Sequence, residues 1–187
     1  MRLFLATRNR DKLEEIEGLL SGLGLAFLSL LDFPGFPDIV EDGETLEENA
    51  IKKAKAAFSR LHMASLADDS GLEVLELGGA PGVHSSRFAG ERATYEENNR
   101  KLLELLKGVP PARRGATFRC VVALVESPGK LLTFEGRATG YIALEPRGDS
   151  GFGYDPLFVV PEAERTFAEL GPQRKSQVSH RAKHHEQ

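Results

Sequence analysis

The sequence predicts a mixed α/β protein, because short apolar runs typical of strands alternate with amphipathic runs typical of helices. Two helix starts carry a capping-box pattern, with Thr45 and Thr94 each followed three residues later by a Glu. Residues 127–129, Ser-Pro-Gly, separate two apolar runs and predict a hairpin turn. With 187 residues, the chain can form one substantial domain or two lobes that share a core.

The expected elements follow from these patterns and from Gly and Pro at their ends. We expect strands over residues 2–7, 25–33, 63–67, 72–77, 116–126, 130–138 and 140–145. We expect helices over residues 12–20, over 46–61, and from 95 to a point before 110. The first helix ends at Gly22 and Gly24, and Pro34 and Pro37 mark a loop.

Composition excludes several classes of protein. A hydrophobic share of 41% and a charged share of 28% are ordinary for a globular protein. The net charge of −4 and the lack of a long basic run argue against a nucleic-acid-binding protein. The longest apolar stretch, residues 23–31, is too short to span a bilayer, and residues 1–6 resemble a strand rather than a signal peptide. The single Cys120 fits a reducing compartment, so we expect a cytoplasmic protein.

Two adjacent acids, Asp68 and Asp69, follow the expected strand at 63–67 and precede Ser70 and Gly71. Neighbouring carboxylates repel each other and lose solvation when buried, so the pair indicates a counter-charge. Mg²⁺ is a suitable one, since it prefers one or two carboxylates together with substrate phosphates. The alternative is an ordinary Asp-Asp-Ser-Gly turn, in which these residues form local hydrogen bonds.

Residues 7–12, Thr-Arg-Asn-Arg-Asp-Lys, lie between the first strand and the first helix. Free backbone N–H groups and the positive end of the helix dipole make such a loop suitable for an anion. A helix capped by Asn9 or Asp11 explains the same residues, and the two interpretations are compatible. The loop lacks the glycines of a true P-loop.

The helix at 46–61 places Asn49 and Lys53 on one flank, one turn apart, beside its apolar face. At about 100° per residue, Lys52 falls on the opposite, solvated face. Glu41 lies in the acidic loop just before this helix. Lys53 is a candidate phosphate ligand, although a lysine at this border can also extend its charged end to solvent.

Residues 151–156, Gly-Phe-Gly-Tyr-Asp-Pro, combine flexible glycines with aromatic rings. The glycines allow the backbone to approach a flat ligand, and Phe152 could lie against it. The alternative is an irregular loop anchored by Phe152 and Tyr154.

A basic cluster occupies residues 174–181. If Ser179 caps a short helix, His180 and Arg181 begin that helix and point in a defined direction. The alternative is a solvated tail.

Acids suited to a divalent cation, lysines suited to phosphate and an aromatic loop suited to a base together predict a site for a nucleotide polyphosphate. The sequence here resembles the inosine triphosphate pyrophosphatases, also called the Ham1-like non-standard purine nucleoside triphosphatases, along nearly its whole length. Three of the motifs lie in the first part of the chain: Thr7-x-Asn9-x-x-Lys12, Glu41-x-Gly43-x-Thr45-x-x-Glu48-Asn49-Ala50-x-x-Lys53-Ala54, and Ala67-Asp68-Asp69-Ser70-Gly71-Leu72. The others are Gly79-x-Pro81-Gly82-Val83-x-Ser85-x-Arg87, Phe152-Gly153-Tyr154-Asp155-Pro156-x-Phe158, and Lys175-x-x-x-Ser179-His180-Arg181.

The resemblance implies a single domain over residues 1–187, with an elongated mixed sheet, two lobes and a central nucleotide cleft. It implies a Mg²⁺-dependent homodimeric hydrolase that converts inosine and xanthosine triphosphates, and their deoxy forms, to the monophosphate and pyrophosphate. Asp69 would be the general base and a metal ligand, and Glu41 a second metal ligand. Lys12, Lys53 and Lys175 would hold phosphates. The full set of implied substrate-binding residues is Thr7, Arg8, Asn9, Arg10, Asp11, Lys12, Asn49, Lys53, Ser70, Phe152, Gly153, Tyr154, Asp155, Lys175, His180 and Arg181.

Other interpretations remain open from the sequence. A non-catalytic nucleotide sensor would bind without turnover, but the intact pair of Asp68 and Asp69 argues against it. An RNA-binding module would use the basic cluster and the aromatic loop, but the net charge of −4 argues against it. Within the enzymes, a Maf-like nucleotide pyrophosphatase acting on other bases is the alternative. The roles of Asp68, relative to Asp69, and of Asp155, at the base or beside Arg181, are open.

Overall fold

A computed structural model describes residues 2–181 and the backbone of residues 184–186, and it shows the expected mixed α/β architecture. The strands are β1 (Arg2–Leu5), β2 (Ala26–Ser29), β3 (Ser65–Val74), β4 (Pro81–Gly82), β5 (Gly115–Ser127), β6 (Lys130–Ile142), β7 (Phe158–Val160), β8 (Arg165–Thr166) and β9 (His184–Glu186). The helices are α1 (Arg10–Leu20), α2 (Leu46–Leu61), α3 (Tyr95–Leu105) and α4 (Phe167–Val178). Within these described residues, no helix is both long and apolar enough to cross a bilayer.

The chain divides into two compact units. The first consists of Met1–Asp69, Cys120–Gly136 and His184–Gln187, and the second of Ser70–Arg119 and Arg137–Lys183. The strands β3, β5 and β6 each contribute residues to both units. The acidic motif is divided at its centre, since Asp69 belongs to the first unit and its neighbour Ser70 to the second.

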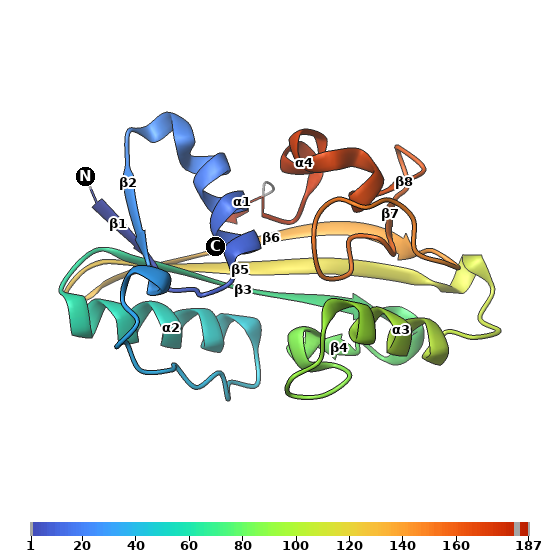
Figure 1. Ribbon diagram of the computed structural model, residues 1–187, viewed down its shortest axis with the longest axis horizontal. Helices are drawn as coiled ribbons and strands as arrows, with labels where there is room; N and C mark the ends of the chain where they lie inside the picture. The colour runs from blue at the N-terminus through green and yellow to red at the C-terminus, as the bar shows by residue number, and fades with distance from the viewer. Residues whose placement is uncertain (1, 182–183, 187) are drawn as a thin grey trace. The chain divides into compact units, whose positions relative to one another are not determined.

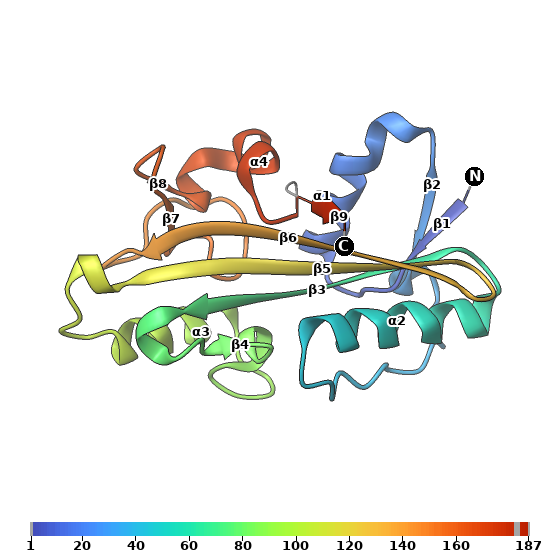
Figure 2. The same cartoon turned by 180° about the vertical axis from the view of Figure 1, so that it is seen from behind.

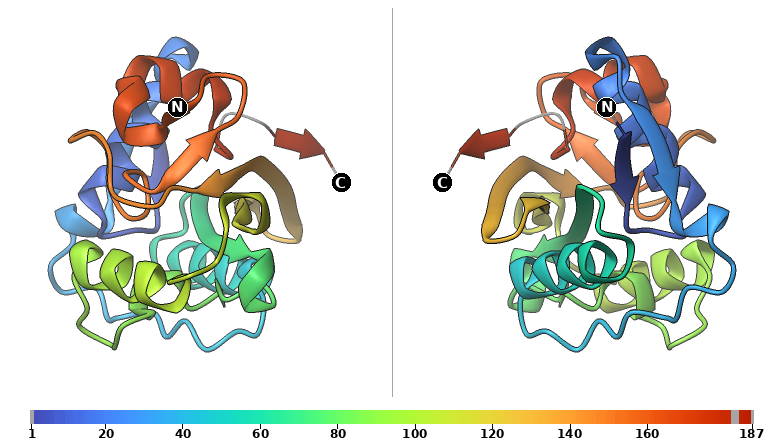
Figure 3. Two further views of the ribbon diagram at one scale, coloured as in Figure 1. Left: turned by 90° about the vertical axis from the view of Figure 1, so that its right-hand side faces the viewer. Right: turned by 90° about the vertical axis from the view of Figure 1, so that its left-hand side faces the viewer.

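In the first unit, β1 is central between β2 and β3 and pairs parallel with both. Next come β5, β6 and then β9. Helices α1 and α2 cover opposite faces of this part of the sheet (Figure 1), as the end-on views also show (Figure 3). On the α1 side, Leu13 and Ile16 pack with Leu3 and Leu5 of β1. This apolar contact fixes the start of α1 against the strand that precedes it.

Helix α2 begins and ends where the sequence predicts. Thr45 is its N-cap and accepts a hydrogen bond from the Glu48 backbone N–H at 3.1 Å. The Glu48 carboxylate accepts from the Glu44 backbone N–H at 2.7 Å, so it caps one residue earlier than in the expected reciprocal box. The buried face includes Asn49 and Lys53 among its alanines. The cap and the packed face thus present two polar side chains to the interior of the unit.

In the second unit, the strand order is β4-β3-β5-β6-β7-β8. Helices α3 and α4 lie on opposite faces of these strands (Figure 2). The core contains Leu102 of α3, Phe118 of β5, Phe158 of β7 and Phe167 of α4, all buried. Helix α4 is kinked at Gly171, whose φ of 71° is left-handed, immediately before Pro172.

The acidic motif is not a turn. We expected a strand that stops at residue 67, but β3 continues without a break from Ser65 to Val74. Asp68 and Asp69 therefore lie in mid-strand and are buried, at 1% and 6% exposure. A buried strand can carry two carboxylates here because lysines from other elements lie beside them.

Two further strand predictions were wrong in their boundaries. The strand expected over 25–33 ends at Ser29, because Ser29 caps a short 3₁₀ helix over Leu30–Asp32 in a reciprocal box with Asp32. The strands expected over 130–138 and 140–145 are joined as β6, with Gly140 inside it. A Cβ at Gly140 would lie 2.2 Å from the Val159 carbonyl oxygen, so glycine is required by the close approach of β7 rather than by a strand end.

Candidate active site

The first unit contains a cluster of acids and lysines around Asp69. Its Oδ1 lies 2.9 Å from Nζ of Lys53, and its Oδ2 accepts a hydrogen bond from Nδ2 of Asn49 at 3.3 Å. Lys53 and Asn49 come from successive turns of α2, so the helix supplies both contacts from one face. The predicted pairing of Asn49 and Lys53 on one flank is therefore correct, but the flank is buried rather than at a solvated border.

Burial and neighbouring charges act in opposite directions on the pKa values of Asp69 and Lys53. Burial raises the pKa of Asp69 above its ordinary value of 3.8, despite the nearby positive charges of Lys53 and Lys12. Burial alone would lower the pKa of Lys53, but the negative charges of Asp69, Glu41 and Asp68 outweigh it and raise that pKa. The lysine is thus held as a cation, beside a carboxylate that binds a proton more readily than an exposed one.

Glu41 reaches the same ammonium group. Its Oε1 lies 3.2 Å from Nζ of Lys53, while its side chain is 38% exposed. The loop that carries it is fixed by the Gly43 backbone N–H, which donates to Oδ1 of Asn49 at 2.8 Å. A Cβ at Gly43 would lie 2.7 Å from that oxygen, so only glycine fits this approach. Two carboxylates from separate segments therefore converge on one cation.

The carboxylates of Glu41 and Asp69 fit the needs of Mg²⁺, which proteins bind through one or two carboxylates together with substrate phosphates. Both are oxygen donors that already face a shared positive charge, that of Lys53. Among the residues that the structure describes, no three or more His, Cys, Asp or Glu side chains are grouped to hold a metal ion. A Mg²⁺ site that substrate phosphates complete needs no third carboxylate.

The loop over residues 7–12 forms a capped helix start. Asn9 is the N-cap of α1, and its side chain accepts from the Lys12 backbone N–H at 3.2 Å. Thr7 Oγ1 accepts from the Asn9 N–H at 3.2 Å. Arg10 and Asp11 form the first turn of the helix. Lys12 extends its ammonium to within 3.2 Å of Oδ2 of Asp68.

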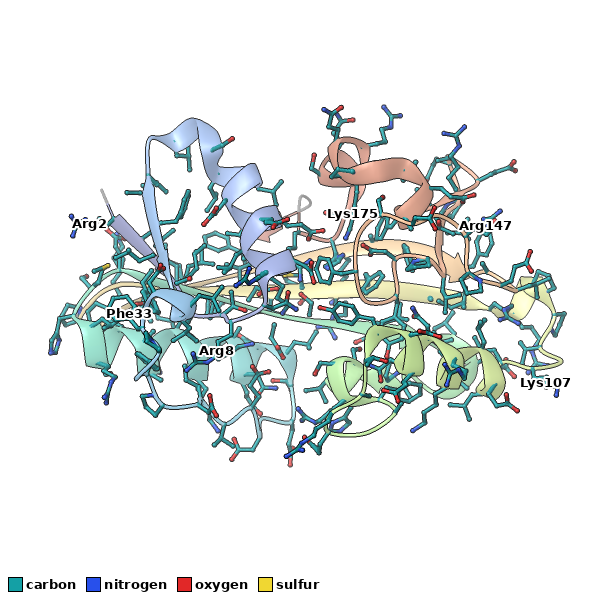
Figure 4. All side chains as sticks on the ribbon, in the orientation of Figure 1. Arg2, Arg8, Phe33, Lys107, Arg147 and Lys175 are labelled. Atoms are coloured by element: carbon teal, nitrogen blue, oxygen red, sulfur yellow. The ribbon has the colours of Figure 1, made fainter. Side chains whose placement is uncertain are left out.

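Arg8 points elsewhere. Figure 4 labels Arg8. Its guanidinium donates to the backbone carbonyl oxygens of Leu30 and Phe36, at 3.3 and 2.6 Å, and lies 3.5 Å from an Asp38 oxygen. These contacts tie the segment after β2 to the loop. The side chain of Arg8 therefore anchors the loop over residues 7–12. Arg8 can then contact a ligand only through its backbone.

The second unit contains the aromatic loop. The Phe152 backbone N–H donates to Oδ2 of Asp155 at 2.9 Å. Asp155 also forms an ion pair with Lys175 of α4, and Figure 4 labels Lys175. Nζ of Lys175 lies 4.6 Å from the centre of the Phe152 ring, and the Arg181 guanidinium carbon lies 5.6 Å from it. Arg181 also donates to Oγ of Ser70 at 3.1 Å. Residues distant in sequence thus meet around one aromatic ring.

Ser179 closes α4 instead of opening another helix. Its backbone is extended, and its N–H donates to the Lys175 carbonyl oxygen at 2.8 Å. The predicted N-cap is therefore wrong. His180 is buried and stacked on Phe118, with ring centres 4.8 Å apart and planes at 12°. Residues 179–181 are buried and are not a solvated tail, and His180 packs against β5.

Two further residues support the aromatic loop. Tyr154 is buried and donates from its hydroxyl to the Ser85 carbonyl oxygen at 2.8 Å, and burial raises its pKa above the ordinary value of 10.0. Asn99 of α3 donates from Nδ2 to the Gly153 carbonyl oxygen at 2.9 Å. Sequence reasoning missed Asn99, because α3 offered no chemistry in its sequence. A buried position on an amphipathic helix occupied by an amide was the available signal.

Comparison with known proteins gives a consistent result. The model of the Ham1 family matches residues 3–187. The chain is 52% identical over 183 residues to a protein of Desulforamulus reducens named dITP/XTP pyrophosphatase, covering 98% of this chain and 91% of the relative. A protein of Geobacter sulfurreducens with the same name is 53% identical, covering 97% and 92% of the two chains. The solved structure of a HAM1 protein from Coxiella burnetii is 46% identical, with a TM-score of 0.87 over 98% of this chain and 93% of the other.

Proposed function

Because this chain belongs to the Ham1 family, we propose that it hydrolyses non-standard purine nucleoside triphosphates to the monophosphate and pyrophosphate. The substrates would be the inosine and xanthosine triphosphates and their deoxy forms, and the role would be to remove them from the nucleotide pool. Two relatives about half identical to it carry the name dITP/XTP pyrophosphatase. The observation that carries the proposal is the contact of the buried Lys53 ammonium with two carboxylates, those of the buried Asp69 and the partly exposed Glu41.

The phosphates would bind in the first unit. Lys12 and Lys53 supply two positive charges from two helices, and both lie beside buried acids. The backbone N–H groups at the start of α1 add neutral donors and the positive end of the helix dipole. Lys175 fits a different role, since it pairs with Asp155 and lies over Phe152. We therefore assign Lys175 to the nucleoside rather than to the phosphates.

The reaction would begin with a water molecule near Asp69. The water oxygen forms a bond to the α-phosphorus, the bond from that phosphorus to the bridging oxygen breaks, and pyrophosphate leaves. Asp69 accepts the proton that the water loses, a role suited to a carboxylate whose pKa burial has raised. Lys53 and Lys12 offset the negative charge of the departing pyrophosphate, which stabilises the transition state electrostatically.

Glu41 and Asp69 would hold Mg²⁺. The ion, when bound, neutralises phosphate charge and lowers the pKa of a bound water. Glu41 is the more exposed of the two carboxylates, so it can meet an ion that arrives with the substrate. Asn49 keeps Asp69 oriented through the hydrogen bond to Oδ2.

The nucleoside would bind in the second unit, against Phe152. The ring offers a stacking surface for the base. Arg181 and His180 can donate hydrogen bonds to the 6-oxo group, which hypoxanthine and xanthine have and adenine lacks. Arg181 is held by Ser70 and by its position over the ring. Asp155 meets Lys175 and the Phe152 N–H, which fits a role in holding the loop. The homodimer implied by the resemblance and the cytoplasmic location inferred from the single Cys120 stay predictions.

The test is a panel of nucleoside triphosphates assayed with and without Mg²⁺, with orthophosphate and pyrophosphate measured separately. We expect pyrophosphate as the first product, strict dependence on a divalent cation, and preference for inosine and xanthosine forms. Orthophosphate with a diphosphate product would contradict attack at the α-phosphorus. Preference for other bases would favour the Maf-like alternative.

A further inference from the structure

We propose that Asp68 is a positioning residue that holds the ammonium of Lys12 in place for the substrate phosphates, an inference that rests on the proposed triphosphate hydrolysis. Asp68 is one of the two acids of the central motif, and the mechanism above gives a role only to the other. Its contacts differ from those of Asp69 and point to a separate task.

The two neighbouring acids have different close partners. Asp68 Oδ2 lies 3.2 Å from Nζ of Lys12, which comes from α1, whereas Asp69 contacts Lys53 and Asn49 of α2. Successive side chains of a strand point to opposite faces, and α1 and α2 cover opposite faces of the sheet. The strand thus directs one acid toward each helix, and each acid has a lysine of its own.

The burial of the Lys12–Asp68 pair is uneven. The Asp68 side chain has no exposed surface, while that of Lys12 is 17% exposed. The carboxylate therefore cannot reach a ligand in solvent, but the lysine can. Cys120 of β5 lies behind the acid, with Sγ 3.8 Å from the same Oδ2, and can donate its weak S–H hydrogen bond there. Asp68 is thus enclosed by protein on the side away from Lys12.

The backbone of Lys12 is already fixed. Its N–H bonds to the side chain of Asn9 in the N-cap of α1. A lysine still has a flexible four-carbon stem, whose freedom must be lost when the ammonium binds a phosphate. The buried charge of Asp68 restricts that stem before the ligand arrives. Preorganisation of this kind improves binding by reducing the entropy lost on binding.

A double-mutant cycle separates this role from others. The four proteins are wild type, Asp68→Asn, Lys12→Met and the double variant, and the readout is the Kd of pyrophosphate with Mg²⁺ present, measured by calorimetry. We expect Asp68→Asn to weaken binding about tenfold, a size in line with coupling between contacting residues. In the Lys12→Met background the same change should have almost no effect. Equal losses in the two backgrounds would overturn the proposal.

Turnover of deoxyinosine triphosphate supplies a second readout. A positioning role predicts that Asp68→Asn changes KM more than kcat, again only when Lys12 is present. If Asp68 were the general base, kcat would fall as far as in Asp69→Asn, in either background, and the proposal would be wrong. If wild type binds pyrophosphate with the expected coupling but does not hydrolyse the triphosphate, the proposed function fails while the positioning role stands.

Two controls exclude a general loss of stability. Val125→Ala removes buried packing from β5 in the same unit without touching an acid or a lysine, and it should lower the melting temperature but leave the pyrophosphate Kd unchanged. If Asp68→Asn does not fold, Asp68→Glu replaces it in both backgrounds, since it keeps the charge but moves it. We expect Asp68→Glu to weaken binding only with Lys12 present, and equal weakening in both backgrounds would refute the inference.

Discussion

The ammonium of Lys53 lies 2.9 Å from Oδ1 of Asp69, and both side chains are more than nine-tenths buried. Glu41 reaches the same ammonium at 3.2 Å from the solvent side. One cation therefore offsets part of the negative charge of two acids, which a bound metal ion would also offset. The opposite charges reduce the free-energy cost of burying Lys53 and Asp69 before a ligand binds. The acids and the lysine also lie close enough together to act on one phosphate chain.

The first prediction concerns Lys53→Met. Removing one partner of a buried pair leaves an uncompensated charge, so we expect the free energy of unfolding to fall by about 3 kcal/mol, together with loss of turnover. Urea denaturation followed by circular dichroism measures the first effect. The neighbouring charge of Lys12 reduces the loss at Asp69 without removing it.

Lys52→Met is the matched control for that change. It removes the same charge from the adjacent position of α2, where Lys52 pairs with Asp42 at the surface. Exposed ion pairs contribute little to stability, because solvent screens their charges, so the control should unfold close to the urea midpoint of wild type and keep its activity. Equal losses in the free energy of unfolding of the two variants would mean that the buried pair stabilises the fold no more than the exposed one.

The second prediction is that Asp69→Asn keeps the fold but loses at least about 10²-fold in kcat, the lower range for a general base. An amide cannot accept the proton and is a poorer ligand for Mg²⁺. Steady-state assays at saturating inosine triphosphate and saturating Mg²⁺ give kcat, and circular dichroism verifies the fold. Turnover within a few-fold of wild type would show that another group is the base.

The local elements were predictable because their signals are local. The helix α2 has both a capping threonine and an apolar face, and these fix its start and its orientation, including that of Asn49 and Lys53. The strand β3 was misjudged at Asp68 and Asp69, because Asp, Ser and Gly favour turns by local rules. The lysines that stabilise these acids in a strand come from two separate helices, which no local rule includes.

Side-chain partners were less predictable than elements. Ser179 was expected to start a helix, because serine favours the N-cap, but its N–H closes α4. Arg8 has the charge expected of a phosphate ligand, yet carbonyl oxygens of the segment after β2 bind its guanidinium. Asn99 lies outside every motif of the sequence, and its contact with Gly153 joins parts of the chain far apart in sequence. Such choices depend on tertiary packing, which sequence periodicity does not encode.

The third prediction concerns stability at low pH. Hydrogen bonds from the Thr94 backbone and side chain lower the pKa of Glu97 below its ordinary value of 4.5, and this side chain is exposed. A lowered folded-state pKa gives stability that is present above the ordinary value and is lost as the pH falls through the lower one. Glu97→Gln should therefore lower the melting temperature at pH 7 but much less at pH 3, as scanning calorimetry at both values would measure. If the difference in melting temperature between wild type and Glu97→Gln is the same at both pH values, the ionised Glu97 carboxylate does not stabilise the start of α3.

The fourth prediction concerns Asn99→Leu. It removes the hydrogen bond to Gly153 while keeping a side chain of similar size on α3. A net loss of about 1 kcal/mol for one buried hydrogen bond corresponds to about a fivefold rise in KM for deoxyinosine triphosphate, with kcat little changed. Steady-state kinetics give both constants. Arg100→Ala, at an exposed position of the same helix, is the control and should leave both unchanged. A fall in kcat alone would contradict a role for Asn99 in holding the aromatic loop.

The last prediction concerns the choice of base. Arg181 lies over Phe152 and donates to Ser70, so its guanidinium is fixed beside the proposed stacking surface. A donor facing a 6-oxo group is satisfied by hypoxanthine but not by adenine, and one unpaired buried group costs about 1–3 kcal/mol. Arg181→Ala should therefore reduce kcat/KM for inosine triphosphate at least about tenfold more than for adenosine triphosphate. Arg174→Ala, at an exposed position of α4, removes the same charge and should not change the ratio. If Arg181→Ala reduces both constants equally, Arg181 does not select the base.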